Sequence, residues 1–127
     1  ERVDHGYRVV DDPEALAAAL ASGVVFTCTP HSTHELSAWE FEPGHRIARM
    51  VRAGLRVTIA TDDAVFFKTD IGREYTVALP AMGLGVEDAA RIARAGFEAA
   101  WCDEESKARL LAEADGLIAA LLAARAA

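Results

Sequence analysis

Histidine and carboxylate side chains gather in three short stretches of the sequence. These are His5-Gly6, the run Thr29–His34 (TPHSTH) and the adjacent pair Asp62-Asp63. Two adjacent carboxylates repel each other, and a bound metal would resolve the repulsion: one carboxylate ligates Zn²⁺ through oxygen while the other orients a substrate or a water. A histidine beside such a pair is a candidate functional residue, and its following glycine lets a ligand approach the backbone.

Each of these residues also has a structural interpretation. Asp62 and Asp63 are equally consistent with a helix N-cap followed by a first-turn acid. A lone histidine such as His5 is more often structural than catalytic. The H-x-x-H spacing of His31 and His34 is not diagnostic of a metal site on a loop, so we interpret both as solvent-facing or supporting residues and leave their roles open.

Aromatic residues flank the same stretches, at Trp39, Phe41, Phe66 and Phe67. Core packing is the default interpretation, although an aromatic wall for a planar base would give the same pattern. His45 is expected to begin a helix in a structural role.

Three apolar, β-rich segments lead into the polar stretches and predict strands over residues 2–5, 24–28 and 57–61. Helices are predicted over 11–23, where Pro13 suits the first turn and Gly23 the end, and over 45–55. The polar segment 29–44 is predicted to be a loop. Further helices are expected over 70–83 and 86–102, followed by a long terminal helix over 103–127 whose first turn is acidic.

Strands alternating with helices predict βαβ units and therefore a parallel α/β sheet. Three parallel strands make a small sheet, so the chain is either a very small α/β domain or part of a larger closed sheet such as a (β/α)₈ barrel of about 250 residues. Active sites of such barrels lie at the carboxyl ends of the strands. The sequence therefore predicts that His5, the Thr29–His34 run, Asp62 and Asp63 share one rim.

Composition narrows the class of protein. With 127 residues the chain is the size of one domain, and its 13 basic and 20 acidic side chains give a net charge of −7. No Lys/Arg cluster predicts nucleic-acid binding, and no apolar run approaches the roughly 18 residues of a membrane span. Cys28 and Cys102 lack metal-ligand spacing and are expected to be buried free thiols in a reducing, cytoplasmic compartment.

Three longer motifs resemble the carboxyl-terminal third to half of the adenosine deaminase family. They are RVDHGYRVVDDPEA (residues 2–15), TCTPHST (27–33) and TIATDDAVFFKTDIGREY (58–75), whose order and spacing agree along almost the whole chain. The combination of HG and TDD is specific, whereas each alone is weak. The resemblance implies the last three βα units of a (β/α)₈ (TIM-type) barrel and a zinc-dependent enzyme that hydrolytically deaminates adenosine or a close 6-aminopurine nucleoside.

The resemblance also implies roles for three residues. Asp62 matches the aspartate that ligates zinc and contacts its water, and Asp63 matches the aspartate that hydrogen-bonds a purine ring nitrogen. His5 matches the histidine that holds the zinc-bound hydroxide. The family's H-x-H pair, its further histidine ligand and its proton-donating glutamate have no counterpart here, and the run His31–Glu35 does not fit them.

We therefore expect residues 1–127 to be the carboxyl-terminal segment of a single deaminase domain, with the amino-terminal half missing or on another chain. Two departures bear on the substrate: Asp4 stands where classical adenosine deaminases have glycine, and Ala64 where proline usually follows the aspartate pair. Adenine deaminase and aminodeoxyfutalosine deaminase remain alternatives, as does a non-catalytic purine-binding module. A homo-oligomer is possible.

Overall fold

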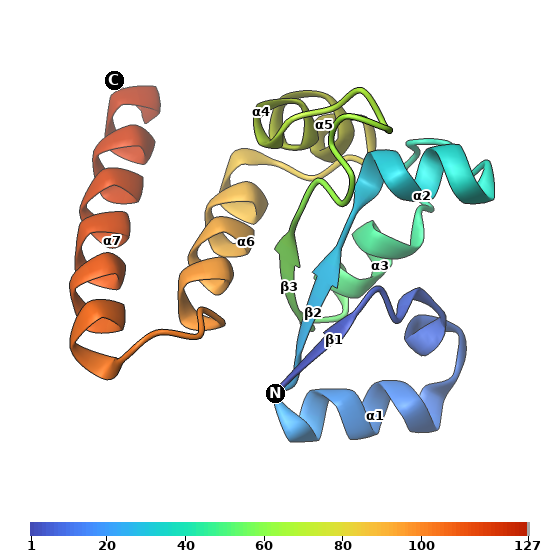
Figure 1. The fold of residues 1–127 in the computed structure, drawn as a ribbon, viewed down its shortest axis with the longest axis horizontal. Coiled ribbons are helices and arrows are strands. Elements are labelled where there is room, and N and C mark those ends of the chain that lie inside the picture. The colour runs from blue at the N-terminus through green and yellow to red at the C-terminus, as the bar shows by residue number, and fades with distance from the viewer. Residues whose placement is uncertain (127) are drawn as a thin grey trace.

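The computed structural model describes residues 1–126, and its centre is a three-stranded parallel sheet. The strands β1 (Arg2–Asp4), β2 (Val25–Cys28) and β3 (Arg56–Ile59) lie in the order β1-β2-β3. All three run in the same direction, so their carboxyl ends meet at one edge of the sheet (Figure 1). This confirms the predicted parallel α/β arrangement.

Helical segments connect and flank the strands. In chain order they are the 3₁₀ turn η1 (Tyr7–Asp11), α1 (Pro13–Ser22), α2 (Pro30–Ser37), α3 (Arg46–Arg52), α4 (Ile71–Arg73), the π-helical turn η2 (Glu74–Ala78), α5 (Leu79–Ala81), α6 (Val86–Glu98) and α7 (Glu104–Ala126). Helix α6 packs against β3, and α7 packs against α6 on the side away from the sheet (Figure 1).

Helix α1 shows how local sequence sets these boundaries. The Asp12 side chain accepts hydrogen bonds from the amides of Glu14 and Ala15, at 2.9 and 3.1 Å, and so caps the helix start. Pro13 occupies the first turn, where its missing N–H costs nothing. Gly23 ends the helix with a left-handed φ of 64°. The predicted helix is confirmed.

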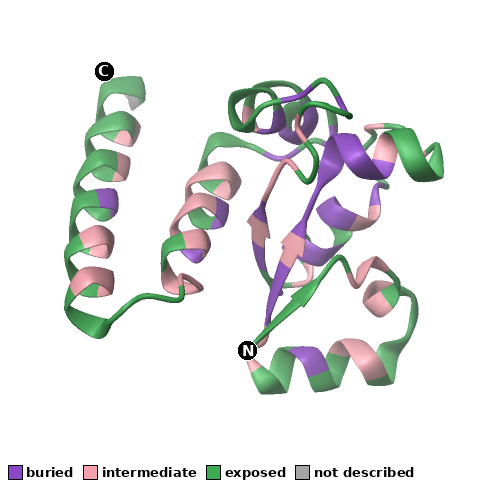
Figure 2. Cartoon of the chain, in the orientation of Figure 1, coloured by how far each residue is buried: buried purple, intermediate pink, exposed green. Residues whose placement is uncertain are grey.

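The core lies around β2, β3 and α3, where buried positions concentrate (Figure 2). Its largest fully buried apolar side chains include Ile47, Met50, Leu79 and Met82. Each such side chain stabilises the fold by about 1.5–3 kcal/mol. Strand β1, by contrast, is exposed along its whole length, and within residues 1–126 neither outer edge of the sheet pairs with a further strand.

The expectations for the segment 29–44 and for Cys102 were wrong. The polar segment 29–44 contains a helix, α2, because Pro30 begins it and the Thr29 carbonyl accepts bonds from the amide and hydroxyl of Thr33. Cys102 is exposed in the connection between α6 and α7, because α6 ends at Glu98; Cys28 is buried as expected. Both thiols are free. None of the helices within residues 1–126 combines the length and apolar character needed to cross a membrane.

Candidate functional site

His5 and Asp62 follow the ends of β1 and β3, and both have a left-handed backbone. Their φ angles are 66° and 58°, values that residues other than glycine rarely adopt. The His5 amide still donates to the Thr27 carbonyl at 2.8 Å, so the backbone bends immediately after the last ladder bond. Strained residues of this kind persist where surrounding contacts hold them, and they cluster at functional sites. The two candidate residues therefore lie on the same rim, as predicted.

Gly6 continues the bend after His5 with a φ of 65°. A Cβ atom at this position would lie 2.8 Å from the ring of Phe26. Packing inside the chain thus requires the glycine, independently of any ligand.

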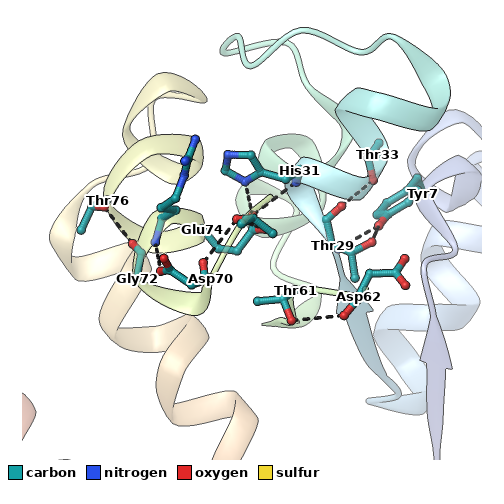
Figure 3. A network of polar contacts seen from close by, with 12 residues as sticks. Tyr7, Thr29, His31, Thr33, Thr61, Asp62, Asp70, Gly72, Glu74 and Thr76 are labelled. Carbon is teal, nitrogen blue, oxygen red and sulfur yellow. Dashed lines mark hydrogen bonds and ion pairs between the residues drawn. The ribbon is translucent and has the colours of Figure 1, made fainter. Parts of the chain in front are cut away.

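Two hydroxyl groups hold the imidazole of His5. Its Nδ1 atom lies 3.3 Å from the Tyr7 hydroxyl and 3.4 Å from Thr29 Oγ1. The Thr29 amide donates to the Tyr7 oxygen at 2.9 Å, which fixes that hydroxyl in turn (Figure 3). Burial raises the pKa of Tyr7, so the phenol is neutral at physiological pH. The other ring nitrogen of His5 has no hydrogen-bond partner within residues 1–126.

The carboxylate of Asp62 accepts two hydrogen bonds. The Ser32 hydroxyl donates to Oδ2 at 2.7 Å, and the Asp63 amide donates to Oδ1 at 2.9 Å. A short bond from a hydroxyl to a carboxylate is charge-assisted and roughly twice as strong as a neutral one. Asp62 is exposed and each oxygen keeps a lone pair, so the carboxylate is oriented and still able to bind a further group.

Asp63 caps a turn. Its Oδ1 accepts from the Phe66 amide at 3.1 Å, and its carbonyl accepts from the Phe67 amide. Asp63 therefore has the capping role of the structural interpretation, but it caps a turn and not a helix. Its Oδ2 has no partner among the described residues, so the same side chain retains an acceptor for a ligand.

The first turn of α2 links the two candidate residues. Thr29, just before it, contacts His5, and Ser32, within it, contacts Asp62. His31 in the same turn is buried and hydrogen-bonds the fully buried Glu74 at 2.8 Å. Of the two interpretations of His31, the structure favours the second: its side chain is buried and supports its neighbours.

The remaining candidates lie away from the strand ends. His34 bonds the Trp39 carbonyl at 3.0 Å. His45 caps α3, as expected, by accepting from the Ile47 amide at 3.2 Å, and burial lowers its pKa to about 4. Of the aromatic residues, Phe67 is buried, whereas Phe66 is 71% exposed and does not belong to the core.

The described residues do not form a complete metal site. Within residues 1–126 no group of three or more His, Cys, Asp or Glu side chains is placed to hold an ion. Asp62 fits as a single oxygen ligand, because its carboxylate is oriented by two donors and exposed. Any further ligands would have to come from outside these residues.

Sequence reasoning missed Tyr7, Ser32 and Glu74 as parts of this arrangement. Tyr7 lies two residues after His5, a spacing that a 3₁₀ turn folds back onto the histidine. Ser32 lies in the Thr29–His34 run, but nothing in a polar segment expected to be a loop singles out its hydroxyl. Glu74 has no sequence signal, because only tertiary structure reveals that its carboxylate is buried.

The sequence matches one known family and several of its members. The adenosine deaminase family model matches residues 1–117. An adenine deaminase of Sinorhizobium medicae is 37% identical over 111 residues, which cover 87% of this chain and 34% of that protein. An adenine deaminase of Geotalea uraniireducens is 34% identical over 116 residues, covering 91% and 33%.

Solved structures also match. The adenine deaminase of Arthrobacter aurescens superposes with a TM-score of 0.85 at 25% identity, over 93% of this chain and 36% of that one. An amidohydrolase of Burkholderia ambifaria with bound Zn superposes with a TM-score of 0.82 at 31% identity, over 97% and 35%. The chain thus spans about a third of the length of these relatives. It belongs to the adenosine deaminase family.

Proposed function

We propose that the chain is the carboxyl-terminal segment of a deaminase domain and forms the last three βα units of its (β/α)₈ barrel. Three observations support this: the strands are parallel, neither edge of the sheet is paired within residues 1–126, and the chain covers only 34% of a relative. The strands missing from this chain would pair with β1 and β3 and close the barrel. Exposure of β1 in the chain alone is consistent with that role, since its partner strand would lie outside residues 1–126.

The reaction proposed for the complete enzyme is zinc-dependent hydrolytic deamination of a 6-aminopurine, which releases ammonia. One observation carries the proposal: His5 and Asp62, both strained, are brought to one rim and joined by the first turn of α2. Zinc, when bound, lowers the pKa of a ligated water toward neutrality and so supplies a nucleophile at physiological pH.

Each residue then has one task. Asp62 would contribute one oxygen to the metal, in the orientation that Ser32 fixes. His5 would hold and orient the attacking water through the ring nitrogen that has no partner within residues 1–126, while Tyr7 and Thr29 hold Nδ1. Asp63 would hydrogen-bond a ring nitrogen of the purine, accepting where that nitrogen carries a hydrogen, as N7 or N9 of adenine can, and so fix which carbon faces the nucleophile.

Adenine is at least as well supported a substrate as adenosine. The relatives at 37% and 34% identity are named adenine deaminase, and Asp4 departs from the glycine of classical adenosine deaminases. Aminodeoxyfutalosine remains a third candidate. A cytoplasmic location and the absence of nucleic-acid binding stay predictions.

The complete enzyme should be tested with adenine, adenosine and aminodeoxyfutalosine, with release of ammonia and loss of the 6-amino chromophore as readouts. We expect zinc-dependent turnover of one of the three. Purine binding without any turnover in the zinc-loaded enzyme would contradict the proposal and favour a non-catalytic module.

A further inference from the structure

Glu74 is a buried carboxylate that the proposed reaction does not use. It is the first residue of η2, and its side chain is completely inaccessible to solvent. Its Oε2 hydrogen-bonds His31 Nδ1 at 2.8 Å and accepts from the His31 amide at 3.3 Å (Figure 3). Its Oε1 accepts from the Thr69 hydroxyl at 3.0 Å. The His31 amide and the Thr69 hydroxyl both donate to this carboxyl group, one to each of its oxygens.

These contacts join two segments that are far apart in the sequence. His31 lies in the first turn of α2, whereas Thr69 lies near the end of the connection from β3 to α4. A carboxyl group without hydrogen-bond partners is expensive to bury, so the burial of Glu74 here requires that both segments stay in place. Glu74 therefore ties the start of α2 to the segment that carries Asp62 and Asp63.

The helix around Glu74 is widened at this point. The Glu74 carbonyl accepts from the amide of Leu79, which lies five residues further along the chain. Pro80 has no N–H to donate to the Thr76 carbonyl. Proline thus accounts for the break in the regular ladder. Single π-turns of this kind occur frequently near functional sites.

We propose that Glu74 is a positioning residue for Asp62, acting through the first turn of α2. Ser32 follows His31 directly and donates to Asp62 Oδ2 at 2.7 Å. By holding both the amide and the imidazole of His31, Glu74 fixes where the Ser32 hydroxyl lies. By holding Thr69, it fixes the other end of the segment that follows Asp62. The inference rests on the proposed role of Asp62 as a metal ligand.

The test uses the complete enzyme, stripped of metal, with zinc affinity measured by competition with a chelator. Glu74→Gln keeps the size of the side chain and removes its charge. We expect zinc binding to weaken by about 10-fold, the lower end of the range for partners of metal ligands. Ser32→Ala should cause a loss of similar size.

A double-mutant cycle separates positioning from general loosening of the fold. If Glu74 acts through Ser32, Glu74→Gln should cause little further loss in the Ser32→Ala background. Ile92→Ala is the matched control, since Ile92 is buried on α6 and contacts none of these groups through hydrogen bonds. It should lower stability and leave zinc affinity unchanged.

Should Glu74→Gln not fold, Thr69→Val removes one donor to the same carboxylate with little change in shape. We expect a few-fold loss of zinc affinity that disappears in the Ser32→Ala background. Unchanged zinc affinity in a folded Glu74→Gln or Thr69→Val enzyme, or losses that multiply in the double variant, would overturn the inference.

Asp62→Asn in the same assay distinguishes a failure of the inference about Glu74 from a failure of the proposed metal role of Asp62. If it loses zinc while Glu74→Gln does not, only the inference about Glu74 fails. If Asp62→Asn binds zinc as well as the unmodified enzyme, the proposed metal role of Asp62 fails and the inference fails with it.

Discussion

The Tyr7 hydroxyl is the contact through which His5 is most directly oriented, so Tyr7→Phe is a sharp perturbation. The change removes one oxygen that contacts His5 Nδ1 at 3.3 Å, Thr29 Oγ1 at 3.1 Å and the Thr29 amide at 2.9 Å. Thr29 is only 4% exposed, so its amide would be left buried without a partner. Leaving such a donor unsatisfied costs about 1–3 kcal/mol of folding free energy.

The effect on turnover should be larger than the effect on substrate binding. A positioned acid or base contributes roughly 10²–10⁴-fold to rate. His5 keeps its contact with Thr29 Oγ1, so only part of that contribution is at stake. We expect kcat of the complete enzyme to fall about 10-fold, with KM for the purine nearly unchanged.

Tyr75→Phe is the matched control, because Tyr75 is also partly buried yet its hydroxyl has no hydrogen bond within residues 1–126. Burial raises its pKa to about 12. Steady-state kinetics and denaturant unfolding of both variants provide the measurement. A Tyr7→Phe enzyme that matches Tyr75→Phe in kcat would refute the idea that Tyr7 orients His5.

Three further predictions concern the fold. Burial lowers the pKa of His45 from 6.5 to about 4, so its contribution of about 3 kcal/mol is present above pH 6.5 and is lost as pH falls through 4. In His45→Asn, which keeps a capping side chain, the free energy of unfolding measured with denaturant should decline less over that range, and an equal decline would contradict the prediction. Thiol reagents should modify the exposed Cys102 in the folded enzyme and the buried Cys28 only on unfolding, because burial also raises the pKa of Cys28. Modification of Cys28 before unfolding would contradict this prediction. Gly6→Ala should lower the free energy of unfolding by about 2–3 kcal/mol, because alanine disfavours the left-handed φ and its Cβ would contact Phe26 too closely. A denaturant midpoint equal to that of the unmodified enzyme would refute this.

Much of the framework was predictable from local patterns. Apolar β-rich segments ending on polar residues predicted the three strands, and the helix between Pro13 and Gly23 followed from capping chemistry that acts over a few residues. Parallel pairing then placed His5 and Asp62 on one rim, since helix-containing crossovers of this kind are typical of strands that run in the same direction.

The interior of the site was less predictable, because it depends on contacts between distant segments. The run PHSTHELS looks like a loop by polarity, yet it forms α2 and its first turn is buried against Glu74, 43 positions after His31. Nor does any periodicity indicate that the Ser32 hydroxyl meets Asp62, 30 positions away. Such pairings follow from the order of strands in the sheet and not from the local sequence.

The division of tasks between the aspartates is the central claim, and zinc content with purine affinity tests it most directly. In the complete enzyme, Asp62→Asn should lose zinc, whereas Asp63→Asn should keep about one zinc and bind purine about 10- to 100-fold more weakly, as expected for a lost charge-assisted hydrogen bond of about 1.5–3 kcal/mol. Asparagine preserves the side-chain shape and an acceptor for the Phe66 amide. Retention of zinc and activity in Asp62→Asn, or unchanged purine affinity in Asp63→Asn, would contradict the account.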